Sequence, residues 1–170
     1  MDDMHALLVD EVKDLYSAES QLVTALPKMA KNAKSAELRQ ALEHHLRQTE
    51  EHVRRLEQVA ERLEAKPRGR KCVGMEGLIA EGKELLKEDG NDRVIDAGLI
   101  GAAQKVEHYE MAAYGTARAH AEELGLADVA RTLQTTLDEE GEANKKLTQI
   151  AESMVNRRAT AGNGGEKTMR

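Results

Sequence analysis

The sequence predicts an all-α fold: a four-helix bundle made of two repeated helical hairpins, joined by a long crossover that carries a short fifth helix. Three observations predict it. The 170 residues contain no Phe, no Trp and only two Pro, and they are rich in Ala, Leu, Glu, Lys and Arg, a mixture that favours helix over strand. Apolar residues recur with the period of a helix. The second half of the chain also repeats the first.

The first hairpin is delimited by helix-capping and helix-breaking residues. One helix is expected over about 3–33, bent at Pro27, and Ser35 is a suitable N-cap for a second helix that ends near residue 65. Residues 66–75 are expected to form a loop, which a short helix over about 75–88 follows. The first hairpin thus ends in a long connection.

The second hairpin begins after this crossover. Gly-Asn-Asp at 90–92 opens a third long helix to Leu124, and Gly125 ends it as a C-cap; a fourth covers about 126–156. We therefore expect one bundle domain over residues 1–156. Residues 157–170 lack apolar periodicity and are expected to form a disordered tail.

The repeat is visible when residues 15–63 are placed on 106–154, an offset of 91 without a gap. Glu19 then falls on Glu110, and segment 58–61 (QVAE) falls on 149–152 (QIAE). Shared Ala, Leu and Glu are weak evidence between helical segments, but the helix breaks at 34–35 and 125–126 also coincide. The chain is therefore expected to contain two related hairpins.

Each long helix carries polar residues at the centre of its apolar stripe. An ionised carboxylate buried without a partner costs several kcal/mol, and no Lys or Arg lies at these centres. Either some of these glutamates stay protonated, or a cation lies among them. The polar residues are Glu19 on the first helix, His45, Thr49 and His52 on the second, Glu107, Glu110 and Tyr114 on the third, and Glu140 and Asn144 on the fourth.

Carboxylate oxygens with imidazole suit iron or manganese, and zinc is an alternative. Metal sites in helical bundles use one Glu on each of two helices and Glu-x-x-His on the other two. Here the second helix has Thr49-x-x-His52 and the fourth has Glu140-x-x-Ala143, while Glu107 should lie level with residues 143–144. We expect two iron ions in an asymmetric site, with imidazole on one side only. One side would have Glu19 and His52, and the other Glu107, Glu110 and Glu140, with Asn144 as a further candidate ligand.

Other polar residues receive a structural interpretation. His45 lies two turns from His52, a rise of about 10 Å, so one metal cannot use both, and His45 is expected to be a hydrogen-bonded core residue. Tyr16 and Tyr114 are expected to bind a glutamate through their hydroxyls. Cys72 lies beside Arg70 and Lys71, a setting in which the thiol could be acidified.

Five segments also resemble a known family. They are YSAESQL, HHLRQTEEHVRRLE, KCVGMEGLIAEG, AAQKVEHYEMAAYGTARAHAEELG and TLDEEGEANKKL. With these segments, the chain is similar to the YciF-like bacterial stress proteins of the ferritin-like superfamily over roughly residues 5–155. This resemblance implies a ferritin-like bundle, a homodimer, a di-iron centre and a role in stress responses, and peroxide removal has been proposed for the family. Family members tend to have Asp where this chain has Asn144.

Charge and length exclude several classes of function. A net charge of −6 with mixed signs argues against a nucleic-acid surface, and no apolar run approaches the ~20 residues of a membrane span. One cysteine fits a reducing cytoplasm. The leading hypothesis is a di-iron oxidoreductase that reacts with hydrogen peroxide or dioxygen. Iron binding without catalysis and a structural protein with protonated glutamates are the alternatives. Without Cys-x-x-Cys, the electron donor would be external and is not identified by the sequence.

Overall fold

The computed structural model describes residues 3–161, and these residues form helices and connections without any strand. The all-α prediction is therefore confirmed. A π-helical segment, Ala151–Val155, joins the last two helices. The α-helices are α1 (Met4–Asn32), α2 (Ala36–Arg62), α3 (Val73–Leu85), α4 (Asp92–Glu123), α5 (Ala127–Ile150) and α6 (Asn156–Ala161).

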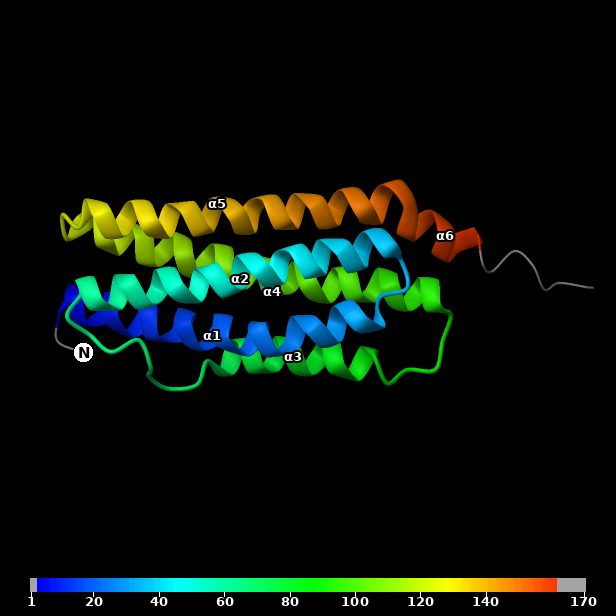
Figure 1. Ribbon diagram of the computed structural model, residues 1–170, viewed down its shortest axis with the longest axis horizontal. Coiled ribbons are helices and arrows are strands. Elements are labelled where there is room, and N and C mark those ends of the chain that lie inside the picture. Colours follow the sequence, from blue (N-terminus) through cyan, green and yellow to red (C-terminus); the bar gives the residue numbers. More distant parts are fainter. Residues whose placement is uncertain (1–2, 162–170) are drawn as a thin grey trace, which may run out of the picture.

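Four long helices form an elongated bundle of two antiparallel hairpins, α1–α2 and α4–α5 (Figure 1). The hairpins pack together through α1 against α4 and α2 against α5. The crossover returns along the bundle, and α3 lies outside it, in contact with α1 and α4. Two hairpins with one long connection are the arrangement expected from the sequence repeat.

The predicted caps account for three helix ends, the starts of α2 and α4 and the end of α4. The Ser35 hydroxyl accepts a hydrogen bond from the backbone N–H of Leu38, and the Asn91 side chain accepts one from Arg93. Gly125 adopts φ 71° directly after α4, in the left-handed region that favours glycine. α1 continues through Pro27 without ending.

Cys72 caps α3, which therefore begins two residues earlier than predicted. Its sulfur accepts from the N–H of Met75 at 3.5 Å. Its Sγ also lies 2.9 Å from the hydroxyl oxygen of Tyr109, whose proton is donated to Asp14 at 2.7 Å. The side chain is buried, and burial raises the pKa of the Cys72 thiol. The hypothesis of an acidified thiol is wrong because Cys72 lies inside the protein and not on the basic loop surface.

The helical region extends beyond the predicted bundle boundary. The π-helical segment redirects the chain so that α6 packs on the first turns of α4, where the Arg93 guanidinium donates to the Arg158 carbonyl at 3.3 Å. Residues 157–161 are therefore helical and not part of a tail. The rest of the predicted tail, residues 162–170, lies outside the described residues.

The apolar core consists of two clusters on either side of a central polar layer. One cluster, around Leu22, Leu42 and Leu99, fills the end near the α1–α2 turn. The other, around Leu15 and Leu133, fills the opposite end. Between them lie the buried carboxyl and imidazole groups of the four long helices. Among the described residues, no helix has the length and apolar character needed to cross a bilayer.

Substitution of Asp96 tests how α4 is joined to the turn between α1 and α2. Its buried carboxylate accepts from the backbone N–H groups of Lys34 and Ser35, at 2.9 and 2.6 Å, and so joins α4 to the α1–α2 turn. Asp96→Asn should lower the free energy of unfolding by about 1–3 kcal/mol, because one buried N–H loses its acceptor.

Urea denaturation measures this effect, and Asp92→Asn on the same helix is the matched control. Asp92 is exposed and lies 3.6 Å from the Lys34 ammonium, so its substitution should change stability by about 0.5 kcal/mol or less. Equal effects of the two substitutions would contradict this account of the turn.

Candidate metal centre

The central layer brings together four glutamates and two histidines. Glu19 comes from α1, Glu107 and Glu110 from α4, and Glu140 from α5. His45 and His52 both come from α2. Glu19, His52, Glu110 and Glu140 are 0% exposed, Glu107 is 2% and His45 is 5%. Every one of the four bundle helices therefore contributes at least one buried ionisable group to this layer.

The first group of ligand atoms belongs to Glu19, His52 and Glu140, whose nearest oxygen and nitrogen atoms lie within 4.8 Å of one another. Nδ1 of His52 lies 3.3 Å from Oε1 of Glu19 and 3.0 Å from Oε1 of Glu140. Glu19 is held from the other side by Tyr114, whose hydroxyl donates to Oε1 at 2.6 Å. This group matches the side of the site expected to contain Glu19 and His52.

The orientation of His52 is fixed by an ion pair behind it. Its Nε2 donates to Oε2 of Glu139 at 2.8 Å, and the Arg55 guanidinium binds both oxygens of Glu139, at 2.6 and 3.1 Å. A histidine that donates one ring N–H to a carboxylate presents its other nitrogen to a metal in many metalloproteins. Glu139 and Arg55 therefore turn Nδ1 of His52 toward Glu19 and Glu140.

The second group contains His45, Glu107, Glu110 and Glu140, again within 4.8 Å of one another. Nε2 of His45 lies 3.4 Å from Oε1 of Glu107 and 3.6 Å from Oε2 of Glu140. Glu140 belongs to both groups and uses one oxygen toward each histidine. Its carboxylate is thus placed to bridge two cations.

Three of the four carboxyls in this layer, those of Glu19, Glu107 and Glu110, resist ionisation. Burial, reinforced by the charge of Glu140, raises the pKa of Glu19 to about 7 although His52 acts against this shift. Burial and neighbouring carboxylates also raise the pKa values of Glu107 and Glu110 well above their usual range. Among the described residues, no Lys or Arg is buried to compensate these charges.

The histidines respond in opposite directions. Burial alone would lower the pKa of His52, but contacts with Glu140 and Glu19 outweigh burial and raise it to about 10. Burial would likewise raise the pKa of Glu140, but His52 and His45 outweigh burial and lower it. Burial lowers the pKa of His45 and outweighs the charge of Glu140, which acts against this shift. His52 and Glu140 thus form an ion pair in the metal-free layer.

Many polar atoms of the layer have no hydrogen-bond partner. Both oxygens of Glu110 and both ring nitrogens of His45 are buried without a hydrogen-bond partner. Buried polar atoms in native proteins are almost always paired. Carboxylate oxygens and imidazole nitrogens are ligands that ferrous iron and manganese accept. The donor set therefore fits two such ions better than it fits a packed polar core.

His45 lies in the group that lacks a histidine at Ala143, whereas the sequence predicted an imidazole on one side only and a hydrogen-bonded core role for His45. The signal was its spacing of seven residues from His52, which excludes one shared metal but not two metals. The two ring centroids are 6.4 Å apart, less than the helical rise, because the side chains lean toward each other.

The remaining predicted site residues have other contacts. Asn144 is half-buried, and its amide oxygen accepts from Gln104 Nε2 at 3.1 Å. Tyr114 binds a site glutamate as expected, whereas the Tyr16 hydroxyl donates to Glu57 outside the layer at 3.2 Å.

Comparison with known proteins agrees with this architecture. Residues 3–160 match a family described as a domain of unknown function, DUF892. The chain is 42% identical to protein YciF of Escherichia coli strain K12 over 160 residues, 94% of this chain and 96% of that protein.

Solved structures show the same similarity. The crystal structure of the Escherichia coli stress protein YciF has a TM-score of 0.88 at 43% identity, covering 92% of this chain and 99% of that one. YcfI of Rhodopseudomonas palustris, provisionally described as a structural protein, has a TM-score of 0.86 at 44% identity, covering 89% and 96%. A Xanthomonas campestris protein at 21% identity, covering 95% and 99%, shares the fold with a TM-score of 0.77. The chain therefore belongs to the DUF892 family of YciF-like stress proteins, as the resemblance predicted.

The carboxyl layer predicts an unusual pH dependence. The metal-free protein should be more stable at pH 5 than at pH 8. Raised folded-state pKa values of Glu19, Glu107 and Glu110 make these groups destabilising as the pH rises above about 4.5, and for Glu19 the change continues to about pH 7. Glu19 alone corresponds to roughly 3 kcal/mol. His52 acts in the same direction above pH 6.5, and His45 acts in the opposite direction below it.

Urea denaturation in chelator at both pH values measures the difference. Glu110→Gln removes one of the raised carboxyls and should reduce the loss between pH 5 and 8, whereas Glu142→Gln, an exposed position on α5, should not. Equal stability of the metal-free protein at the two pH values would show that the carboxyls do not resist ionisation.

Proposed function

We propose that the protein is a stress protein that binds two iron ions per chain and reacts with hydrogen peroxide or dioxygen, as a non-haem di-iron oxidoreductase. The observation that carries this proposal is the pair of buried ligand groups that share Glu140. Cations held by these two groups would act together on one small oxidant.

The residues of the layer would have different roles at the two metal positions. Glu19 and His52 would hold one ion, His45, Glu107 and Glu110 the other, and Glu140 both. When bound, two ferrous ions supply the two electrons that reduce an O–O bond. Arg55 and Glu139 keep His52 in its orientation, and the Tyr114 hydroxyl keeps Glu19 in place. The two apolar clusters limit water on either side of the layer.

Iron is the favoured metal because the donor set combines hard carboxylate oxygens with one imidazole on each side. Manganese would accept the same ligands, and zinc would accept the imidazoles. The chain has no Cys-x-x-Cys pair, so continued turnover would require an external electron donor. That donor and the homodimer implied by the family remain predictions.

A second candidate function is metal binding without turnover. Glu19, Glu110 and Glu140 are fully buried and come from three helices of the two hairpins, so a metal bound by them would join the hairpins. The provisional description of Rhodopseudomonas palustris YcfI as a structural protein points the same way. Binding of metal would then stabilise the folded state without consuming an oxidant.

Metal analysis tests the site directly. Protein loaded anaerobically with ferrous iron and then desalted should hold close to two ions per chain. Glu140→Ala should lose both ions because Glu140 belongs to both groups, whereas His45→Ala should lose mainly one. The matched controls Glu142→Ala and His44→Ala, both exposed neighbours of these residues, should retain two.

Stopped-flow mixing with hydrogen peroxide then separates the two candidates. Rapid oxidation of the bound ferrous iron supports the oxidoreductase, and a loaded protein that leaves the peroxide unchanged supports the structural role. Metal-free protein after loading, or full occupancy in Glu140→Ala, would contradict both.

A further inference from the structure

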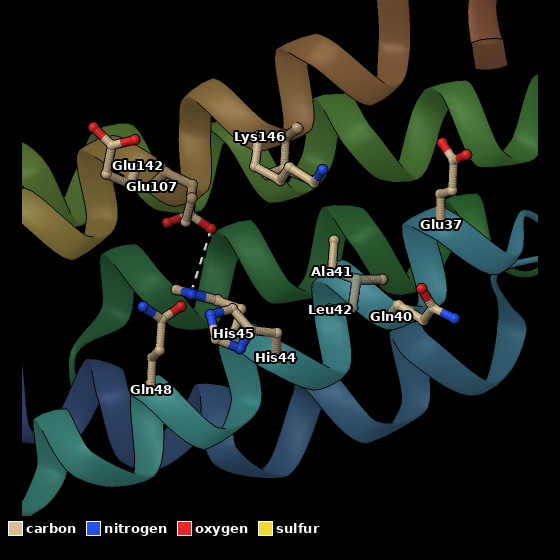
Figure 2. Close-up of a pocket in the computed structure, with 12 residues that line it drawn as sticks. Glu37, Gln40, Ala41, Leu42, His44, His45, Gln48, Glu107, Glu142 and Lys146 are labelled. Atoms are coloured by element: carbon tan, nitrogen blue, oxygen red, sulfur yellow. Dashed lines mark ion pairs between the residues drawn. The ribbon is translucent and has the colours of Figure 1, made fainter. Parts of the chain in front are cut away.

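A cavity of about 460 Å³ lies between α2 and α5 and reaches the second ligand group. Figure 2 shows His45 and Glu107 of that group facing each other at one part of its wall, with Nε2 and Oε1 3.4 Å apart. Glu37, Glu142 and Lys146 line the cavity and are exposed, so the space connects the buried centre with the surface.

The cavity is much larger than hydrogen peroxide requires. A water molecule occupies roughly 30 Å³ in the liquid, and hydrogen peroxide is only slightly larger. Pockets for small organic ligands typically measure about 300–1,000 Å³, the range in which this cavity falls. Its lining includes the apolar side chains of Ala41, Leu42, Ala143 and Leu147. Size and lining both indicate an organic ligand with an apolar body.

The cavity is also elongated. Its lining residues on α2 extend from Glu37 to Gln48, eleven residues that correspond to about 16 Å of helix at 1.5 Å per residue. Figure 2 shows Gln48 and His45 toward one end and Glu37 at the other. A ligand in this space would thus have one end at the ligand group and the remainder along the α2–α5 groove.

The space exists because of the residue at position 143. The ordinary Glu-x-x-His motif would place an imidazole there, but this chain has Ala143 and takes its imidazole from His45 across the groove. Alanine leaves empty the volume that a histidine side chain would fill. Ala41 on the facing helix is equally small.

The inner end of the cavity is polar and has unused hydrogen-bonding capacity. Nδ1 of His45 and Oε2 of Glu107 lack hydrogen-bond partners and are not the atoms that face each other at 3.4 Å in the ligand group, although His45 is only 5% exposed and Glu107 2%. A ligand with one polar head and an apolar body would therefore match both parts of the cavity.

We propose that this cavity binds an organic hydroperoxide, with the hydroperoxide group at His45 and Glu107 and the apolar body between Ala41, Leu42, Ala143 and Leu147. The proposal rests on the di-iron function above and names its substrate class. The O–O bond breaks, the hydroperoxide takes up two electrons and two protons, and an alcohol and water leave. The two electrons come from the two ferrous ions, each of which becomes ferric.

Binding can be tested without metal. Cumyl alcohol (2-phenylpropan-2-ol), the redox-inert product of cumene hydroperoxide, should bind the metal-free full chain, as measured by calorimetry. Ala143→Leu and Ala41→Leu fill the cavity from opposite helices and should weaken binding at least tenfold. Ala119→Leu, on an exposed part of α4 that does not line the cavity, should change it less than twofold. Circular dichroism checks that each variant is folded.

Reactivity is then measured as a single turnover of ferrous-loaded protein. Ala143→Leu should lower the rate with cumene hydroperoxide at least tenfold more than it lowers the rate with hydrogen peroxide, at unchanged iron content. Oxidation by hydrogen peroxide but not by cumene hydroperoxide would overturn this proposal and leave the di-iron function intact. No oxidation by either would overturn the di-iron function and this proposal with it.

One further outcome identifies a different occupant. If cumyl alcohol does not bind, and Ala41→Leu and Ala143→Leu instead change the dimer dissociation constant in sedimentation measurements, the groove is an interface between copies of the chain. That result would overturn the proposal.

Discussion

The burial of four carboxyl groups in one layer is the constraint on which the rest of the structure depends. Glu19, Glu107, Glu110 and Glu140 are almost completely excluded from water, and no buried Lys or Arg accompanies them among the described residues. Such a layer would repel itself if fully ionised. The pKa values of Glu19, Glu107 and Glu110 are raised because ionisation of these buried groups is unfavourable. Two cations would remove the cost, and the apolar clusters on both sides then complete a continuous core.

The internal repeat explains how an asymmetric site arises on a symmetric frame. With the offset of 91, Glu19 corresponds to Glu110, Thr49 to Glu140 and His52 to Ala143. The first half therefore keeps only the His of the Glu-x-x-His motif, and the second half keeps only the Glu. His45 compensates for the missing imidazole, and its own counterpart, Thr136, accepts a hydrogen bond from the Arg55 that orients His52 through Glu139. The polar site residues therefore differ between the two repeats, while both repeats have the same helical-hairpin backbone.

Most of the fold and the composition of the layer could be predicted from the sequence. Helix ends follow from local capping at Ser35 and Gly125, and inward glutamates follow from helical periodicity. The role of His45 could not, because it depends on side-chain rotamers that bring two rings closer than the helical rise suggests. The helix after Val155 was missed because its sequence lacks apolar periodicity, whereas in the structure it packs on α4, where the Arg158 carbonyl accepts from Arg93, 65 residues away. Local sequence patterns therefore predict the helices and their ends, whereas contacts between distant residues determine which polar side chains lie together.

The two halves of the layer also differ in their access to solvent. On the Glu19 side, Tyr114 covers the carboxylate, and the Arg55–Glu139 pair stands behind His52. On the other side, His45 and Glu107 line the α2–α5 cavity. Alanine at position 143 departs from the ordinary ligand motif and leaves room along this path. A reactant that enters through the cavity therefore meets the His45–Glu107 half first, while the Glu19–His52 half remains enclosed by protein.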